Sequence, residues 1–215
     1  MKGLLAKDFA LMKQRGMILL FLVGWGIVMS FVMNDSSYVV GWIVMIATIT
    51  SVSTISYDEY DNCMPFLMSL PVTRRDYALE KYAFSLICGI AFWIIALIIV
   101  FVRGLFTEGF FSFPTDIFAL LLIFALTLIV VAVSIPPQLK WGAEKGRLIM
   151  FILFGVIVVV AFLLSRFAAV KVVATAEKLN TLITPGVVFA FIGLCLALTG
   201  LSAWISVRIM KKKEF

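Results

Sequence analysis

Histidine is absent from this chain of 215 residues, and charged side chains make up only 14% of it. Ordinary globular chains contain about 25% charged residues. Because hydrophobic residues reach 63% of the sequence, too few polar side chains remain to cover the surface of a water-soluble fold. The composition therefore predicts an integral membrane protein and excludes a soluble domain.

Cysteine is also scarce, with three residues at Cys63, Cys88 and Cys195. None of them falls in a segment that we assign to the outer side of the membrane, so no disulfide is expected. Because histidine and paired cysteine spacings are both missing, the sequence predicts no zinc site. We therefore expect neither a metal nor a cofactor in this chain.

Six charge-free runs are long enough to cross a bilayer. A helix needs about 20 apolar residues to span the hydrocarbon core. The runs cover residues 16–34, 36–57, 82–102, 117–139, 148–165 and 179–207. The predicted fold class is thus all-α, with six transmembrane helices in a single domain over residues 1–215. The prolines Pro136 and Pro137 are expected to end the fourth of these helices, because proline cannot continue a helix.

Lysine and arginine are distributed unevenly between the loops. If the N-terminus lies inside, 14 of the 18 basic residues fall on inner segments. The four on outer segments are Arg103, Arg166, Lys171 and Lys178. Such a bias is typical of the positive-inside rule. We therefore predict a plasma-membrane protein with both termini in the cytoplasm. The net charge of +6 then reflects contact with anionic lipid headgroups, and no nucleic-acid partner is expected.

Ionisable residues are missing from the middle of every predicted span. Proton- and ion-coupled carriers usually place such groups or broken helices there. The phosphate-binding pattern G-x-x-x-x-G-K-[ST] is missing as well. The chain is therefore not expected to be an enzyme. Energy for uphill transport through it would have to come from another subunit at the inner face.

Charge is instead concentrated in residues 56–82, "SYDEYDNCMPFLMSLPVTRRDYALEKY", which hold five of the twelve acidic residues. The acidic side chains at its start are Asp58, Glu59 and Asp61. A short apolar piece follows, and its large side chains are Met64, Phe66, Leu67 and Leu70. We expect these apolar side chains to be exposed on a helix of about two turns at most. Exposed apolar residues surrounded by charge mark a protein-binding surface; the alternative is a loop folded back on the inner leaflet.

The next helix begins within the same segment. Thr73 and Asp76 fit the capping box [ST]-x-x-[DE], in which side chains satisfy the free backbone donors of a helix start. Arg74 lies just inside that start. The apolar piece is thus predicted to sit between two longer helices.

Three other patterns have structural or functional interpretations. Residues 1–16 place Leu4, Leu5, Phe9 and Met12 near one helical face, which favours an interfacial helix over a simple charged anchor. Hydroxyl groups gather in the inner half of the run 36–57; they serve helix packing or line a substrate path at Thr50, Ser51 and Thr54. Small residues form a stripe that lets another helix approach closely. They are Gly186, Ala190, Gly193, Ala197 and Gly200.

The chain resembles the ABC-2 type permeases. The resemblance rests on three motifs within residues 56–82: "YDE" (residues 57–59), the "LP-x-[ST]-R" turn and "EKY". It also rests on the start "MKGLLAKDF" and on the six-helix plan. It implies a type V exporter-like permease that forms a homodimer or heterodimer with a second permease copy. It also implies two separate ABC ATPase subunits at the cytoplasmic face, which bind ATP and Mg²⁺. Residues 57–81 would be the coupling loop, residues 1–16 the connecting helix, and residues 166–184 an outer re-entrant segment.

The resemblance further implies export of an amphipathic or hydrophobic substrate, such as a peptide of the phenol-soluble modulin type. Two other functions remain open on the sequence. One is a passive pore or small-solute carrier that works without an ATPase. The other is a membrane scaffold or sensor.

Overall fold

The computed structural model describes residues 2–32, 36–59, 63–69, 72–106, 115–142, 144–152, 155–156, 159 and 185–212. Within these ranges the chain is helical and contains no strand, which confirms the predicted all-α fold class. The helices are α1 (Lys2–Gln14), α2 (Gly16–Val32), α3 (Ser36–Val52), α4 (Thr54–Glu59), α5 (Cys63–Ser69), α6 (Arg74–Phe106), α7 (Thr115–Trp141) and α10 (Pro185–Lys212).

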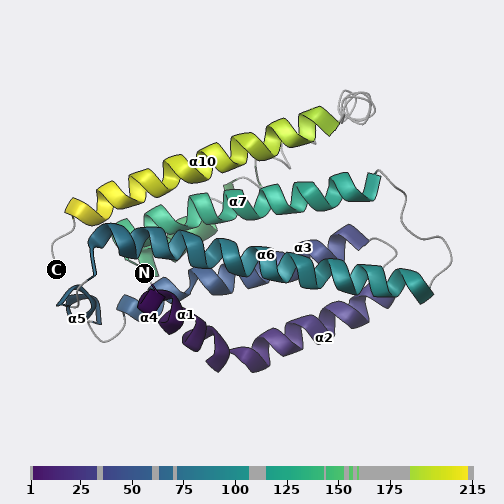
Figure 1. The fold of residues 1–215 in the computed structure, drawn as a ribbon, viewed down its shortest axis with the longest axis horizontal. Helices are drawn as coiled ribbons and strands as arrows, with labels where there is room; N and C mark the ends of the chain where they lie inside the picture. The colour runs from purple at the N-terminus through teal and green to yellow at the C-terminus, as the bar shows by residue number, and fades with distance from the viewer. Residues whose placement is uncertain are drawn as a thin grey trace.

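The long helices form a bundle, and the short ones gather at one end of it (Figure 1). Helix α6 packs against α3, α7 and α10, and α3 also packs against α2 and α7. Helices α1, α4 and α5 lie at the same end as the last turns of α10, and we call this end the short-helix end. It contains the segment in which the sequence concentrates its charge.

Four described helical stretches are long and apolar enough to cross a membrane. They are Tyr38–Glu59, Arg74–Arg103, Leu120–Trp141 and Gly186–Lys212. A fifth span results if α1 and α2 count as one span, with a bend of 64° between them. Most of the predicted fifth helix, residues 148–165, and the predicted outer segment 166–184 lie outside the described residues. Four or five of the six predicted spans are thus present in the part that the structure describes.

Helix α7 does not end at its two prolines. The prediction that Pro136 and Pro137 end this helix is wrong, because α7 continues to Trp141. Proline has no backbone N–H, so Pro136 leaves the carbonyl of Ala132 without its partner one turn later. The hydroxyl of Ser202 in α10 donates to this carbonyl at 2.5 Å. A neighbouring helix therefore replaces the hydrogen bond that the proline removes.

Ser202 belongs to a buried chain of hydroxyl groups between α6, α7 and α10. The Tyr82 hydroxyl lies 2.7 Å from the Ser202 hydroxyl and 2.8 Å from the Ser206 hydroxyl. Because the single proton of Ser202 goes to Ala132, Tyr82 must donate to Ser202, and Ser206 must then donate to Tyr82. The three helices are thus joined by one directed hydrogen-bond chain.

We expect Ser202→Ala to lower the stability of the bundle. The substitution leaves the partly buried Ala132 carbonyl without this donor, which costs about 1–3 kcal/mol. Thermal unfolding in detergent, followed by tryptophan fluorescence, would measure the loss. Ser206→Ala is the matched control, because it leaves the bond to the carbonyl in place. Equal midpoints for the two variants would show that Ser202 does not compensate for Pro136.

Candidate functional site

Helix α5 lies between the helical stretch Tyr38–Glu59, whose last segment is α4, and the long helix α6. Helix α4 ends at Glu59, α5 covers Cys63–Ser69, and α6 begins at Arg74. At the start of α6 the backbone N–H of Asp76 donates to the Thr73 hydroxyl at 3.1 Å, and that hydroxyl donates to the Asp76 carboxylate at 2.7 Å. Both the short helix and the helix start at Thr73 are confirmed.

The apolar side chains of α5 divide between two faces. Met64 and Leu67 are buried in a core cluster with residues of α1, α3, α4, α6, α7 and α10. The prediction that both are exposed is wrong: residues three apart share one helix face, and this face packs onto the bundle. Phe66 points away and is 67% exposed. Asp61 and Leu70 lie outside the described residues.

The residues that flank α5 contact the ends of three other helices. At the end of α7, Gly142 adopts a φ of 87°, and a Cβ there would come within 3.0 Å of the Glu59 carboxylate. Arg74 donates to the backbone carbonyl of Lys211 in α10 at 3.2 Å. Arg147 donates to the Ser56 hydroxyl at 2.8 Å. A displacement of α5 would therefore reach several helices of the bundle.

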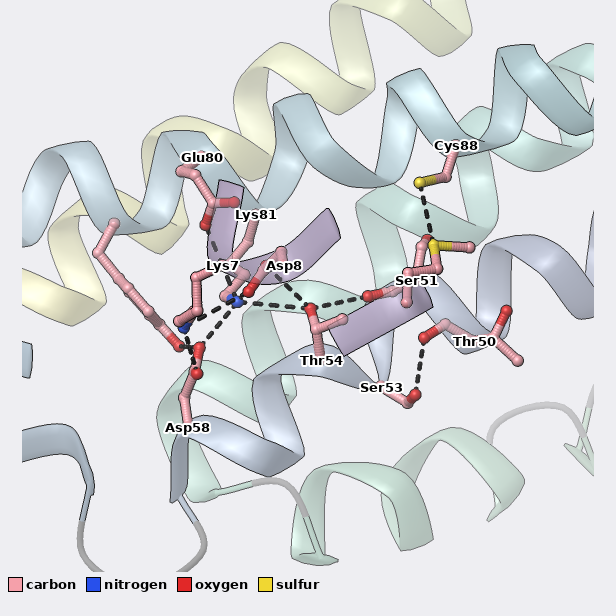
Figure 2. Close-up of polar contacts among 12 residues, drawn as sticks. Lys7, Asp8, Thr50, Ser51, Ser53, Thr54, Asp58, Glu80, Lys81 and Cys88 are labelled. Carbon is pink, nitrogen blue, oxygen red and sulfur yellow. Dashed lines mark hydrogen bonds and ion pairs between the residues drawn. The ribbon is translucent and has the colours of Figure 1, made fainter. Parts of the chain in front are cut away.

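Between α1, α4 and α6 lies a buried group of charges that we call the ion cluster (Figure 2). Its members are Lys7, Asp8, Asp58, Glu80 and Lys81. The Lys81 ammonium lies 2.5 Å from Asp8 Oδ2 and 2.7 Å from Asp58 Oδ2. Lys7 donates to the other oxygen of Asp58 and lies 3.4 Å from Asp8 Oδ1. All members except Lys7 are almost completely buried.

Uncharged groups complete the surroundings of the ion cluster. The Tyr77 hydroxyl donates to Asp58 Oδ2 at 3.0 Å. The Thr54 hydroxyl lies 3.1 Å from Asp8 Oδ2 and 3.4 Å from the Lys81 ammonium. A buried charge is costly unless it is paired and hydrogen-bonded. The ion cluster therefore stabilises the packing of α1, α4 and α6 only while its ion pairs and hydrogen bonds are formed.

Helix α1 follows α6 beyond the ion cluster. The rings of Phe9 and Phe84 meet edge to face with centroids 5.1 Å apart. One turn further, the Cys88 thiol donates to the Met12 sulfur at 3.4 Å. The interfacial position predicted for residues 1–16 stays a prediction, but α1 is packed against the bundle here.

The ion cluster was not identified from the sequence. Asp8 lies four residues after Leu4 and four residues before Met12, so all three share one face of α1. A charged residue on an otherwise apolar helix face is a signal of a buried ion pair. Its partner Lys81 is 73 residues away along the chain, and Asp58, which shares this lysine, is 50 residues away. No local pattern connects either residue to Asp8.

The three hydroxyl residues proposed to line a substrate path lie at the end of α3 and the start of α4. Thr50, Ser51 and Thr54 each donate to the backbone carbonyl three residues earlier, at 2.8, 2.8 and 2.9 Å. Ser51 and Thr54 are buried, and Thr50 is partly exposed. These bonds fit the packing interpretation, and a role in a substrate path stays a prediction.

The stripe of small residues lies on the outer face of α10. Gly186, Ala190, Gly193, Ala197 and Gly200 are all exposed. No described atom lies within 4 Å of the position that a Cβ would occupy on Gly186, Gly193 or Gly200. The helix packs onto α7 and α6 through other residues, such as Cys195 and Ser202. Among the described residues, the stripe is therefore an uncovered surface.

Two apolar grooves run along α3. The first, of about 570 Å³, lies between α2 and α3 and is lined by aromatic side chains that include Phe21, Trp25 and Trp42. The second, of about 480 Å³, lies between α3 and α7 and includes Met45 and Leu126. Both surfaces suit hydrophobic chains rather than charged solutes.

A bundle of apolar helices that are long enough to cross a bilayer defines a polytopic membrane protein. The family model described as "ABC-2 family transporter protein" matches residues 3–211. This range is almost the whole chain, so the chain belongs to the ABC-2 transporter family, and the resemblance noted above is confirmed. The family indicates a membrane permease of an ABC transporter. No curated protein and no solved structure matches the chain.

Proposed function

We propose that this chain is the permease subunit of an ABC exporter and that separate ATPase subunits bind it at the short-helix end. The observation that carries this proposal is the arrangement of α5. Met64 and Leu67 fix the helix to the bundle, while Phe66 remains 67% exposed. An exposed aromatic side chain on an anchored helix is suited to fill a socket on a partner protein.

Energy from a partner also fits the composition of the chain. No phosphate-binding loop occurs in the sequence, so ATP and Mg²⁺ would bind to two ATPase subunits rather than to this chain. The uneven distribution of basic residues supports a cytoplasmic position for the short-helix end, where ATP is available. The chain itself would not be an enzyme. It would convert movement of α5 into movement of the spans.

The two apolar grooves support an amphipathic or hydrophobic substrate. Their linings consist almost entirely of apolar and aromatic side chains on α2, α3 and α7. A peptide with one apolar face could bury that face in such a groove, whereas an ion or a sugar would lose its hydration without compensation. We propose outward movement of such a substrate across the plasma membrane.

Isolation of the tagged chain from the membranes of its own host tests the proposal. We expect an ATPase with a Walker motif to co-purify, and we expect amphipathic peptides to stimulate ATP hydrolysis by the complex in vesicles. Absence of any ATPase from the isolated protein would favour the passive pore or small-solute carrier. An ATPase complex whose hydrolysis responds to no substrate would favour a scaffold or sensor.

We further propose that the α10 stripe contacts a second permease copy. Gly193→Leu would then weaken the dimer about tenfold, because one close helix contact in lipid is worth about 1–2 kcal/mol. Analytical ultracentrifugation in detergent would measure the dimer dissociation constant. Gly24→Leu on α2 is the matched control, since Gly24 is also exposed, with no described atom within 4 Å of its Cβ position. Unchanged association of Gly193→Leu would exclude the stripe from the dimer contact.

A further inference from the structure

The charges of the ion cluster do not balance. When all five groups are ionised, three carboxylates (Asp8, Asp58 and Glu80) face two ammonium groups (Lys7 and Lys81). Glu80 and Asp8 are fully buried, and Asp58 and Lys81 nearly so. An uncompensated negative charge in such a place is costly, so the site needs one more positive charge or one more proton.

The unsatisfied oxygens show where the charge is missing. Neither oxygen of Glu80 has a hydrogen-bond donor, and Asp8 Oδ1 also lacks one. The three N–H donors of Lys81 are directed to Asp8, Asp58 and Thr54, and its ammonium is 3.8 Å from the Glu80 carboxylate. Lysine has three donors, so none remains for Glu80. The missing donor must therefore come from elsewhere.

The Glu80 and Asp8 carboxyl groups lie against the same Lys81 ammonium, at 3.8 Å and 2.5 Å from its nitrogen. Two ionised carboxylates beside one ammonium repel each other, and a single proton between them removes the repulsion. We propose that Asp8 and Glu80 share one proton, which Glu80 carries and donates to Asp8 Oδ1. This proton gives Asp8 Oδ1 its donor, makes Glu80 neutral, and leaves two carboxylates opposite two ammonium groups.

The charged groups around Glu80 come from every neighbouring element of the ion cluster. Helix α1 provides Lys7 and Asp8, α4 provides Asp58 beyond the Lys81 ammonium, and α6 provides Lys81 itself. Helix α6 also provides the titratable Tyr77 hydroxyl. Its polar contacts with α10 include those of Tyr82 with the Ser202 and Ser206 hydroxyls and that of Arg74 with the Lys211 carbonyl. Among the described residues, Lys7 and Lys81 are the cations that form ion pairs with Asp8, Asp58 and Glu80.

The shared proton connects α1 to α6, because Asp8 belongs to α1 and Glu80 to α6. If α1 separates from α6, water reaches both carboxyl groups and the proton leaves to bulk solvent. The closed arrangement then binds one proton more than the open one. Its stability must fall as the pH rises, and the opening equilibrium can increase by about tenfold per pH unit. The site is thus a proton-dependent latch on α1.

Cys88 reports this opening. Its thiol is buried and contacts Met12 of α1, so separation of α1 exposes it to a water-soluble thiol reagent. The labelling rate of Cys88, resolved from that of the other cysteines by peptide mass spectrometry, is measured between pH 5 and pH 8 for the purified chain. The same measurement on Glu80→Gln corrects for titration of the thiol itself. The amide that this substitution introduces does not titrate, and it can donate to Asp8 permanently.

We expect the ratio of the wild-type rate to the Glu80→Gln rate to rise with pH, by up to about tenfold per unit, and to level off where Glu80 is ionised in the closed arrangement as well. Glu144→Gln, which changes an exposed carboxylate, should follow the wild type. A constant ratio would overturn the proposal. The assay needs no ATPase, so its outcome is independent of the proposed transport function.

Infrared spectroscopy of the wild type tests the same proton directly, whether or not the variant folds. A protonated carboxyl group has a C=O stretching band that is separate from the bands of carboxylates and amides. We expect this band at neutral pH, its loss as the pH is raised, and its absence from Glu80→Gln. A wild-type spectrum without the band at neutral pH would show that Glu80 is ionised and would overturn the proposal.

Discussion

Phe66→Ala is expected to weaken binding of the ATPase subunits by an order of magnitude or more while the permease itself remains folded. Phe66 is 67% exposed and makes no contribution to the core cluster that contains Met64 and Leu67. Burial of a phenylalanine side chain is worth about 1.5–3 kcal/mol, and about 1.4 kcal/mol corresponds to a factor of ten in affinity. Pull-down of the ATPase and substrate-stimulated ATP hydrolysis would measure the effect.

Substitutions at two other residues of α5 distinguish an effect on ATPase binding from an effect on the stability of the permease. Ser69→Ala changes another exposed residue of α5 and should leave ATPase binding intact. Leu67→Ala removes a buried side chain, so it should lower the thermal stability of the permease by about 2–5 kcal/mol. If Phe66→Ala binds and hydrolyses like the wild type, α5 is not the coupling element. The alternative of a loop that rests on the inner leaflet would then be favoured.

The acidic residues next to α5 have different environments, which bears on their expected roles. Asp58 is nearly fully buried in the ion cluster, and Glu59 is partly buried against Gly142. A direct role in ATPase docking stays a prediction for both. Asp58 can also act indirectly, since it precedes α5 by a few residues and bonds to α1 and α6. Movement of α5 would thus displace Asp58 and disturb the ion cluster.

The helical plan could be predicted from the sequence because membrane spans follow composition. A run such as 82–102 needs no knowledge of its neighbours, since hydrocarbon excludes charge from any helix that crosses it. The start of α6 at Thr73 was equally predictable, because a capping box is a local interaction. The continuation of α7 past Pro136 was not, because the compensating donor, Ser202, lies 70 residues away from the carbonyl it serves.

The candidate site was predictable only in part, for the same reason. The short helix before α6 could be predicted from local spacing, but the burial of Met64 and Leu67 depends on a core to which six other helices contribute. The ion cluster depends on contacts across 51 and 73 residues. Sequence patterns report what a segment prefers, and they do not report which distant charge will neutralise a buried one.

The second large effect is expected from Lys81, whose ammonium joins Asp8 of α1 to Asp58 of α4. Lys81→Met keeps most of the side-chain volume and removes the charge. Two buried carboxylates then lack their main partner, and breaking a buried ion pair in this way costs about 3–5 kcal/mol. We expect the variant to accumulate poorly in membranes and to unfold at a clearly lower temperature in detergent. Lys145→Met, at an exposed lysine, is the matched control and should behave as the wild type.

A compensating variant distinguishes lost charge balance from lost packing. Lys81→Met combined with Asp8→Asn and Asp58→Asn removes the two carboxylates that the lysine neutralised. Replacing all members of a buried ion pair is much less costly than removing one, so this triple variant should be more stable than Lys81→Met alone. Lys7 does not prevent the recovery, because it is partly exposed and can reach water. If the triple variant is less stable than the single one, side-chain packing rather than charge balance holds α1 against α4 and α6.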